Sequence, residues 1–112
     1  MIGIMANEYT LFNDLAREAE IPENGILSRT LYQDDHVKVI LFGFAAGQEL
    51  TAHTAPMRAS IHIVDGSAKL TLGSDVIDGT PGTWAMMEPK LEHGIRALTP
   101  TRMLLMMYKQ SR

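Results

Sequence analysis

Two histidines are the residues of this chain best suited to binding or proton chemistry. His53 follows Gly47 in the stretch GQELTAHTAP, and His93 comes later, in LEHGIR. An imidazole can bind a metal ion, exchange a proton near neutral pH, or hold a polar ligand through hydrogen bonds. Ala55 stands two residues after His53, where an HxH pair would place a second imidazole. The stretch therefore poses a choice between a metal site and a pocket without a metal.

One carboxylate, Glu88, is a candidate partner for the two histidines. It lies in the expected turn before the strand of His93, and a partly buried carboxyl group there could act as an acid or a base. The alternative interpretation is a solvated loop charge. Glu92 alternates with His93, so in a continuous strand its side chain should face away from the imidazole. The candidate catalytic residues are thus His53, His93 and Glu88.

The segments that must position these side chains have the pattern of short β-strands. Each is rich in β-branched, Leu and Met residues and ends at a turn signal, such as Asp65-Gly66, which favours a type I′ hairpin. The expected strands are Ile26–Tyr32, Val37–Phe44, Glu49–His53, Ser60–Val64, Ala68–Leu72, Thr83–Met87, Gly94–Leu98 and Met103–Tyr108. Short strands at this spacing, with no helix between them, indicate an all-β sandwich or barrel.

A short helix is expected before the strands. Thr10 can cap it, and apolar residues at three- and four-residue spacing continue to Ala19, before Pro22 ends the helix. We therefore divide the chain into an N-terminal segment with this short helix, residues 1–25, and a β-barrel domain, residues 26–112.

Composition narrows the classes of function. The chain has 112 residues, 46% of them hydrophobic and 21% charged, as expected for one globular domain. Its formal net charge is -3 with both signs interspersed, which favours neither nucleic acid nor a membrane as partner. There is no cysteine, so a disulfide, a thiolate metal site and a cysteine nucleophile are excluded. The start, MIGIMANEYT, lacks the pattern of a signal peptide, and we expect a cytoplasmic protein.

The order of glycines and histidines resembles the two motifs of the small single-domain cupins. The first motif of that family is G-x5-H-x-H-x3,4-E-x6-G. Gly47, His53 and Gly66 match it, while Ala55 takes the second His position and Ala59 the Glu position. The resemblance implies the cupin double-stranded β-helix, a jelly-roll barrel, over residues 26–109.

The second cupin motif, G-x5-P-x-G-x2-H-x3-N, is matched in part. Gly82 and His93 occupy its Gly and His positions. Glu88 replaces the Pro, Lys90 the second Gly and Ala97 the Asn. Because cupins include enzymes, storage proteins and ligand sensors, this resemblance fixes the expected fold more closely than the function.

The resemblance also bears on metal binding, because cupins usually hold a metal through three His and one Glu inside the barrel. Of those four positions, only His53 and His93 keep a ligand in this chain. Fe, Mn or Zn want three or more protein ligands, so we expect no tightly bound cofactor, with a weakly held divalent metal ion as the alternative. Met57 and Met86 could complete a soft, copper-like set, although Met more often fills core space.

The expected pocket is mostly apolar, with two imidazoles. It comprises His53, Ala55, Met57, Ala59, Trp84, Met86, His93 and Ala97. Such a pocket suits a small, mostly apolar ligand with one polar handle. The first hypothesis is therefore a small-molecule-binding or sensing cupin domain. A metal-dependent enzyme of dioxygenase or isomerase type and a metal-free acid-base enzyme remain the alternatives.

The C-terminal run RMLLMMYK is apolar on both faces, unlike a strand with one face in water. We therefore expect a homodimer that covers part of this strand or of the neighbouring strand, residues 26–32.

Overall fold

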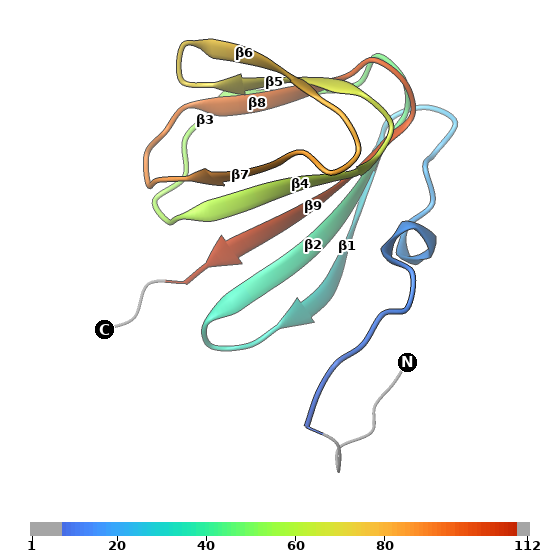
Figure 1. The fold of residues 1–112 in the computed structure, drawn as a ribbon, viewed down its shortest axis with the longest axis vertical. Helices are drawn as coiled ribbons and strands as arrows, with labels where there is room; N and C mark the ends of the chain where they lie inside the picture. Colours follow the sequence, from blue (N-terminus) through green and yellow to red (C-terminus); the bar gives the residue numbers. More distant parts are fainter. Residues whose placement is uncertain (1–7, 110–112) are drawn as a thin grey trace.

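Two antiparallel sheets form the body of the molecule (Figure 1). The structure is a computed structural model, and it describes residues 8–109. One sheet has five strands in the order β1-β2-β9-β4-β7, and the other has four in the order β3-β8-β5-β6. The strands are β1 (Ile26–Gln33), β2 (Val37–Phe44), β3 (Glu49–His53), β4 (Ala59–Asp65), β5 (Ala68–Leu72), β6 (Asp75–Gly79), β7 (Trp84–Met87), β8 (His93–Ala97) and β9 (Thr101–Tyr108). The predicted all-β class is confirmed.

The turn signals located most strands correctly. The predicted bounds of β2, β3 and β5 agree with the structure at both ends. Those of β1, β7 and β9 differ by one or two residues at one end, and those of β4 and β8 by one residue at each end. Gly66 connects β4 to β5 with a φ of 89°, in the left-handed region that glycine adopts without strain. A side chain there would also collide with the backbone of Pro100 and Thr101. The hairpin therefore needs glycine for both conformation and space.

One strand, β6, escaped the sequence analysis. Its segment, Asp75–Gly79, ends in Asp78-Gly79, a pair of residue types typical of turns. In the structure β6 pairs only with β5 and forms an edge of the four-stranded sheet, with its first four residues exposed. Polar residues and glycine are tolerated on such an edge because one side of the strand faces water.

The short N-terminal helix is confirmed, but its predicted start and cap were wrong. It is a single 3₁₀ turn, η2 (Leu15–Glu18), rather than a helix capped by Thr10. Asp14 is the N-cap, and its carboxylate accepts a hydrogen bond from the Ala16 backbone N–H at 3.1 Å. The helix therefore begins four residues later than expected, and it ends at Glu18, ahead of Pro22.

The segment that follows η2 packs on the outer face of the five-stranded sheet, beside β2 and β9 (Figure 1). Arg102 in β9 donates a hydrogen bond from Nε to the Ala19 carbonyl at 2.8 Å and forms an ion pair with Asp65. The backbone at Glu20 lies so close to Gly43 that a side chain there would not fit. Leu41, on the same outer face of β2, is fully buried.

The hydrophobic core lies between the two sheets. Every second residue of β4 faces inward, and Ala59, Ile61 and Ile63 are all buried. They meet buried residues of the opposite sheet, among them Leu70 and Ile95. No helix in the described part of the chain is long and apolar enough to cross a membrane.

Candidate functional site

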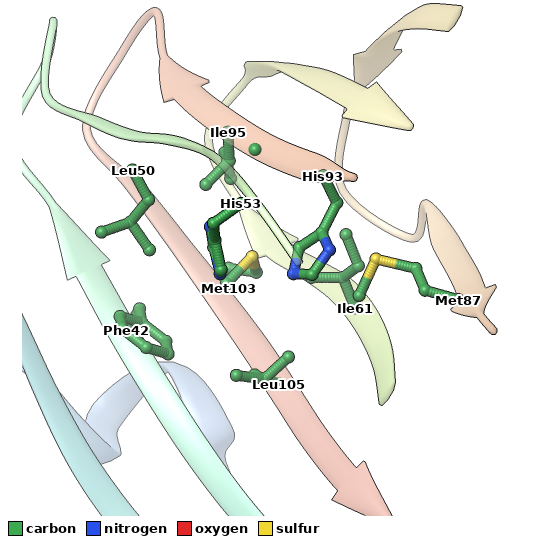
Figure 2. A pocket seen from close by; sticks show the side chains of 10 residues that line it. Phe42, Leu50, His53, Ile61, Met87, His93, Ile95, Met103 and Leu105 are labelled. Atoms are coloured by element: carbon green, nitrogen blue, oxygen red, sulfur yellow. The ribbon is translucent and has the colours of Figure 1, made fainter. Parts of the chain in front are cut away.

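A cavity of about 100 Å³ lies between the two sheets, at the end where β3 pairs with β8. Figure 2 shows His53 and His93 projecting into it beside apolar side chains from both sheets. The lining residues are Phe42, Leu50, His53, Ile61, Met87, His93, Gly94, Ile95, Met103 and Leu105. The two imidazoles are the only polar side chains in this lining.

A bulge in β3 places His53 on the inner face of its sheet. Leu50 pairs with Ile95, and three residues later His53 pairs with His93, so β3 has one extra residue between these two pairs. In a regular strand, residues three apart point to opposite faces, but here Leu50 and His53 both line the cavity. The extra residue thus turns His53 inward to face His93.

Gly94 leaves the space that this bulge occupies. A Cβ at position 94 would lie 2.9 Å from the Leu50 carbonyl oxygen and 3.0 Å from the Ala52 nitrogen. Both are backbone atoms, which cannot turn away as a flexible side chain would. Glycine beside His93 therefore allows the bulged backbone of β3 to approach β8 closely.

Each imidazole is held by the backbone carbonyl two residues before it. His53 Nδ1 lies 2.9 Å from the Thr51 carbonyl oxygen, and His93 Nδ1 lies 2.9 Å from the Leu91 carbonyl oxygen. A carbonyl oxygen only accepts, so in both rings the proton of the hydrogen bond sits on Nδ1. In the neutral rings, both Nε2 atoms then carry a free lone pair.

The two rings form a pair at the mouth of the cavity. Their centroids are 4.4 Å apart, and their planes are tilted by 54°. His53 is exposed and His93 half-buried, so the imidazole end of the cavity opens to solvent. A molecule entering here would meet two proton-accepting nitrogens first and apolar walls beyond them.

The remaining predicted pocket residues do not line this cavity. Ala59 and Ala97 face inward but are packed in the core, with 4% and 0% of their surface exposed. The alanines at these positions complete the core instead of widening the pocket. Trp84 is 59% exposed, and it pairs with His62 on the outer face of β7 and β4.

Strand parity explains the misplaced methionines. Met86 shares the outward parity of Trp84, whereas its neighbour Met87 is 2% exposed and lines the cavity. Met57, like Ala55, lies in the loop between β3 and β4, beyond the end of the strand. The thioethers of the cavity are therefore those of Met87 and Met103.

Glu88, the third catalytic candidate, is not brought into the cavity. Its side chain is 70% exposed, and one carboxylate oxygen lies 3.5 Å from Nη2 of Arg58. This is the solvated loop charge that the sequence left as the alternative. Nearby, Lys90 has a φ of 71°, the left-handed conformation expected for the Gly that the second motif places there. Its N–H donates to the Ala55 carbonyl at 2.8 Å, which ties together the two loops after β3 and before β8.

Eight lining residues were not predicted from the sequence, and all of them lie on strands. They are Phe42, Leu50, Ile61, Met87, Gly94, Ile95, Met103 and Leu105. Inward parity along each strand could have selected most of them. The bulge in β3 and the depth of each residue in the barrel have no sequence signal of this kind.

The metal site of the cupin motifs is a poor fit to these residues. Within residues 8–109, no group of three or more His, Cys, Asp or Glu side chains is placed to hold a metal ion. The cavity offers two imidazoles and two thioethers, and it lacks the carboxylate and third imidazole that hard metal ions require.

Comparisons with known proteins agree with this architecture. No family model matches the chain, and no curated protein matches it significantly. Among solved structures, a conserved protein of unknown function from Streptococcus pyogenes is 28% identical, with a TM-score of 0.83 over 94% of this chain and 92% of its own. A cupin superfamily protein from Desulfitobacterium hafniense is 29% identical, with a TM-score of 0.82 over 92% of this chain and 93% of its own.

A third structure shares the fold at lower identity. An RmlC-like cupin from Desulfovibrio desulfuricans is 21% identical, with a TM-score of 0.78 over 89% of this chain and 97% of its own. The two-sheet antiparallel architecture is thus a cupin jelly roll. The chain therefore has the fold of a small cupin domain.

Proposed function

We propose that this cupin domain binds a small, mostly apolar molecule between its sheets, with His53 and His93 holding the polar end. The observation that carries the proposal is an apolar cavity that ends at two imidazoles, each with Nδ1 already bonded to a backbone carbonyl. Binding pockets commonly combine apolar walls with a few positioned polar groups.

The size of the cavity limits the ligand. Its volume of about 100 Å³ is below the ~150 Å³ of an engineered cavity that takes up benzene. The part of the ligand inside is therefore a short aliphatic body, and any larger part extends through the open mouth beside His53.

Carbon-13 labelling of the methionine methyl groups tests this function. Met87 and Met103 line the cavity, whereas Met57 and Met86 lie outside the lining and serve as internal references. We expect at least one of a panel of small molecules with a branched four-carbon body to shift the Met87 and Met103 signals alone. Met→Leu variants assign the signals. If no member of the panel shifts either cavity methyl, the proposed function is wrong.

A pair of variants links the response to the cavity. Leu50→Phe adds volume to the lining, and we expect it to abolish the ligand-induced shifts. Leu98→Phe makes the same change at a side chain that is 43% exposed and outside the lining, and binding should persist. Equal loss in both variants would separate the response from the cavity.

Catalysis by the same site is the second candidate function. The centroids of the two rings lie 4.4 Å apart, and each ring has an Nε2 atom that can take up a proton from a bound molecule, which supports a metal-free acid-base role for His53 and His93. For a metal-dependent enzyme, elemental analysis of protein purified without chelator or affinity tag is the test. We expect less than one Fe, Mn, Zn, Ni or Cu per chain. One tightly held metal that is lost in His53→Ala would favour the metalloenzyme instead.

The cytoplasmic location remains a prediction.

A further inference from the structure

We infer that the polar end of the ligand is a neutral group with two polar hydrogens, of which a primary carboxamide is the simplest. This inference rests on the proposed function and specifies its ligand. It follows from the protonation pattern of the site, which makes both imidazoles acceptors toward the cavity.

The first step concerns the direction of the hydrogen bonds. The Nδ1–H groups of His53 and His93 are used by the carbonyl oxygens of Thr51 and Leu91, each at 2.9 Å. Each neutral ring then offers only an acceptor, its Nε2. A ligand group that also only accepts, such as a carboxylate or a tertiary amide, would meet two lone pairs and find no partner.

The second step concerns the rest of the cavity. Apart from Gly94, the other lining residues have aliphatic, thioether or phenyl side chains, and none of these side chains donates a hydrogen bond or carries a charge. A cationic handle would lose its hydration without meeting a carboxylate, and burial of an unpaired charge is costly. A neutral donor avoids both costs.

The third step concerns spacing. The ring centroids are only 4.4 Å apart, and an N–H···N or N–H···O bond spans about 3 Å between heavy atoms. A nitrogen with two hydrogens does not fit between ring faces this close, so it would lie in front of both ring edges and donate one hydrogen to each Nε2 atom. Because His53 is exposed, the carbonyl oxygen of a carboxamide can remain in water at the mouth.

A matched series of probes tests the handle at about pH 8, above the range in which imidazoles ordinarily take up a proton. Isobutyramide has two polar hydrogens, N,N-dimethylisobutyramide has none, and isobutyrate is a charged acceptor on the same body. We expect isobutyramide to shift the Met87 and Met103 methyl signals and the Nε2 nitrogen-15 signals of both histidines. Each of the other two probes should bind at least tenfold more weakly.

Two variants assign the acceptors. In His53→Asn and His93→Asn, the shorter amide can still donate to the Thr51 or Leu91 carbonyl but does not reach the position of Nε2. Each change should weaken isobutyramide binding about tenfold, the loss of one hydrogen bond. His62→Asn, on the outer face, should leave binding unchanged. Thermal unfolding of each variant shows whether it is folded.

The outcomes separate this inference from the proposed function. If isobutyrate or the dimethyl amide binds as tightly as isobutyramide, the donor handle is wrong while ligand binding in the cavity stands. If isobutyramide shifts the methionine methyls but both Asn variants bind it as well as the wild type, the histidines are not the acceptors and the inference also fails. If no probe shifts Met87 or Met103, the proposed function fails with it.

Discussion

The two faces of the five-stranded sheet both carry large apolar side chains, but the outer face is enclosed only in part. On the inner face, Ile63 is fully buried and Met87 is 2% exposed, because the four-stranded sheet covers them. On the outer face Trp84 is 59% exposed, and Met86, adjacent to Met87, points the same way. The comparison teaches that side-chain type alone does not identify the core; the covering layer does.

The outer face carries two rows that cross three strands, each with a polar residue between two large apolar ones. Strand pairing aligns Trp84, His62 and Leu104 in one row, and Met86, Ser60 and Met106 in the next. Antiparallel sheets with one face in water usually alternate apolar and polar residues. The N-terminal segment covers the region near Arg102, and the rows beyond it suit a further covering layer.

The largest expected effect contrasts truncation on the two faces. Ile63→Ala removes a fully buried side chain, and we expect it to lower the free energy of unfolding by about 2–5 kcal/mol. Leu27→Ala deletes a side chain of the same size from the outer face of β1, where Leu27 is 49% exposed, and should cost less than about 1 kcal/mol. Urea unfolding measures both. Equal losses would mean that the outer face is as enclosed as the inner one.

The second effect is on the wall of the cavity opposite this sheet. Gly94→Ala introduces a Cβ 2.9 Å from the Leu50 carbonyl oxygen, so the β3 backbone must shift. We expect the free energy of unfolding to fall by about 1–3 kcal/mol and the His53 ring to be displaced. Urea unfolding measures the free energy, and the nitrogen-15 shifts of the His53 ring report its displacement. An unchanged His53 spectrum would show that the bulge does not depend on the glycine.

The third effect tests what covers the outer face. We expect the protein to be a homodimer at micromolar concentration, as the apolar residues in the rows of the outer face suggest, and Trp84→Glu to weaken the dimer more than tenfold by placing a charge in the interface. Val76→Glu, a change at a 67% exposed position on β6, is the matched control and should leave the mass unchanged. Light scattering measures the mass. A monomeric wild type would contradict this prediction.

The smallest effect lies outside both faces, in the turn between β1 and β2. Asp34 accepts hydrogen bonds from the His36 N–H, the Tyr32 hydroxyl and the Val37 N–H, which lower the pKa of its carboxyl group to about 2. The hydrogen bond between the Tyr32 hydroxyl and Asp34 also raises the pKa of Tyr32. Asp34 therefore contributes stability above its unfolded pKa of about 4, and this contribution is lost as pH falls toward 2.

Urea unfolding between about pH 2 and 6 checks this turn. Asp34→Asn should reduce the pH dependence of stability in that window, whereas Asp35→Asn removes the same charge from the next residue and should preserve it. If both variants keep the slope of the wild type, the hydrogen bonds to Asp34 do not stabilise the fold.

Local chemistry made much of the fold predictable from the sequence. Glycines and Asp-Gly pairs end strands because they accept turn conformations, so the bounds of β2 and β5 were correct. His53 and His93 were identified as a pair through motif spacing, and the structure places their rings 4.4 Å apart. The edge strand β6 was missed because its two aspartates and its glycine are residue types typical of turns.

The walls and direction of the site were decided by tertiary structure. The sequence fixes that Met86 and Met87 point to opposite faces, but only the position of the second sheet decides that Met87 faces the cavity. The bulge at β3 turns His53 inward because β8 offers a glycine opposite it, and the two segments are far apart in the chain. Burial and strand register are properties of distant segments brought together, so no local pattern contains them.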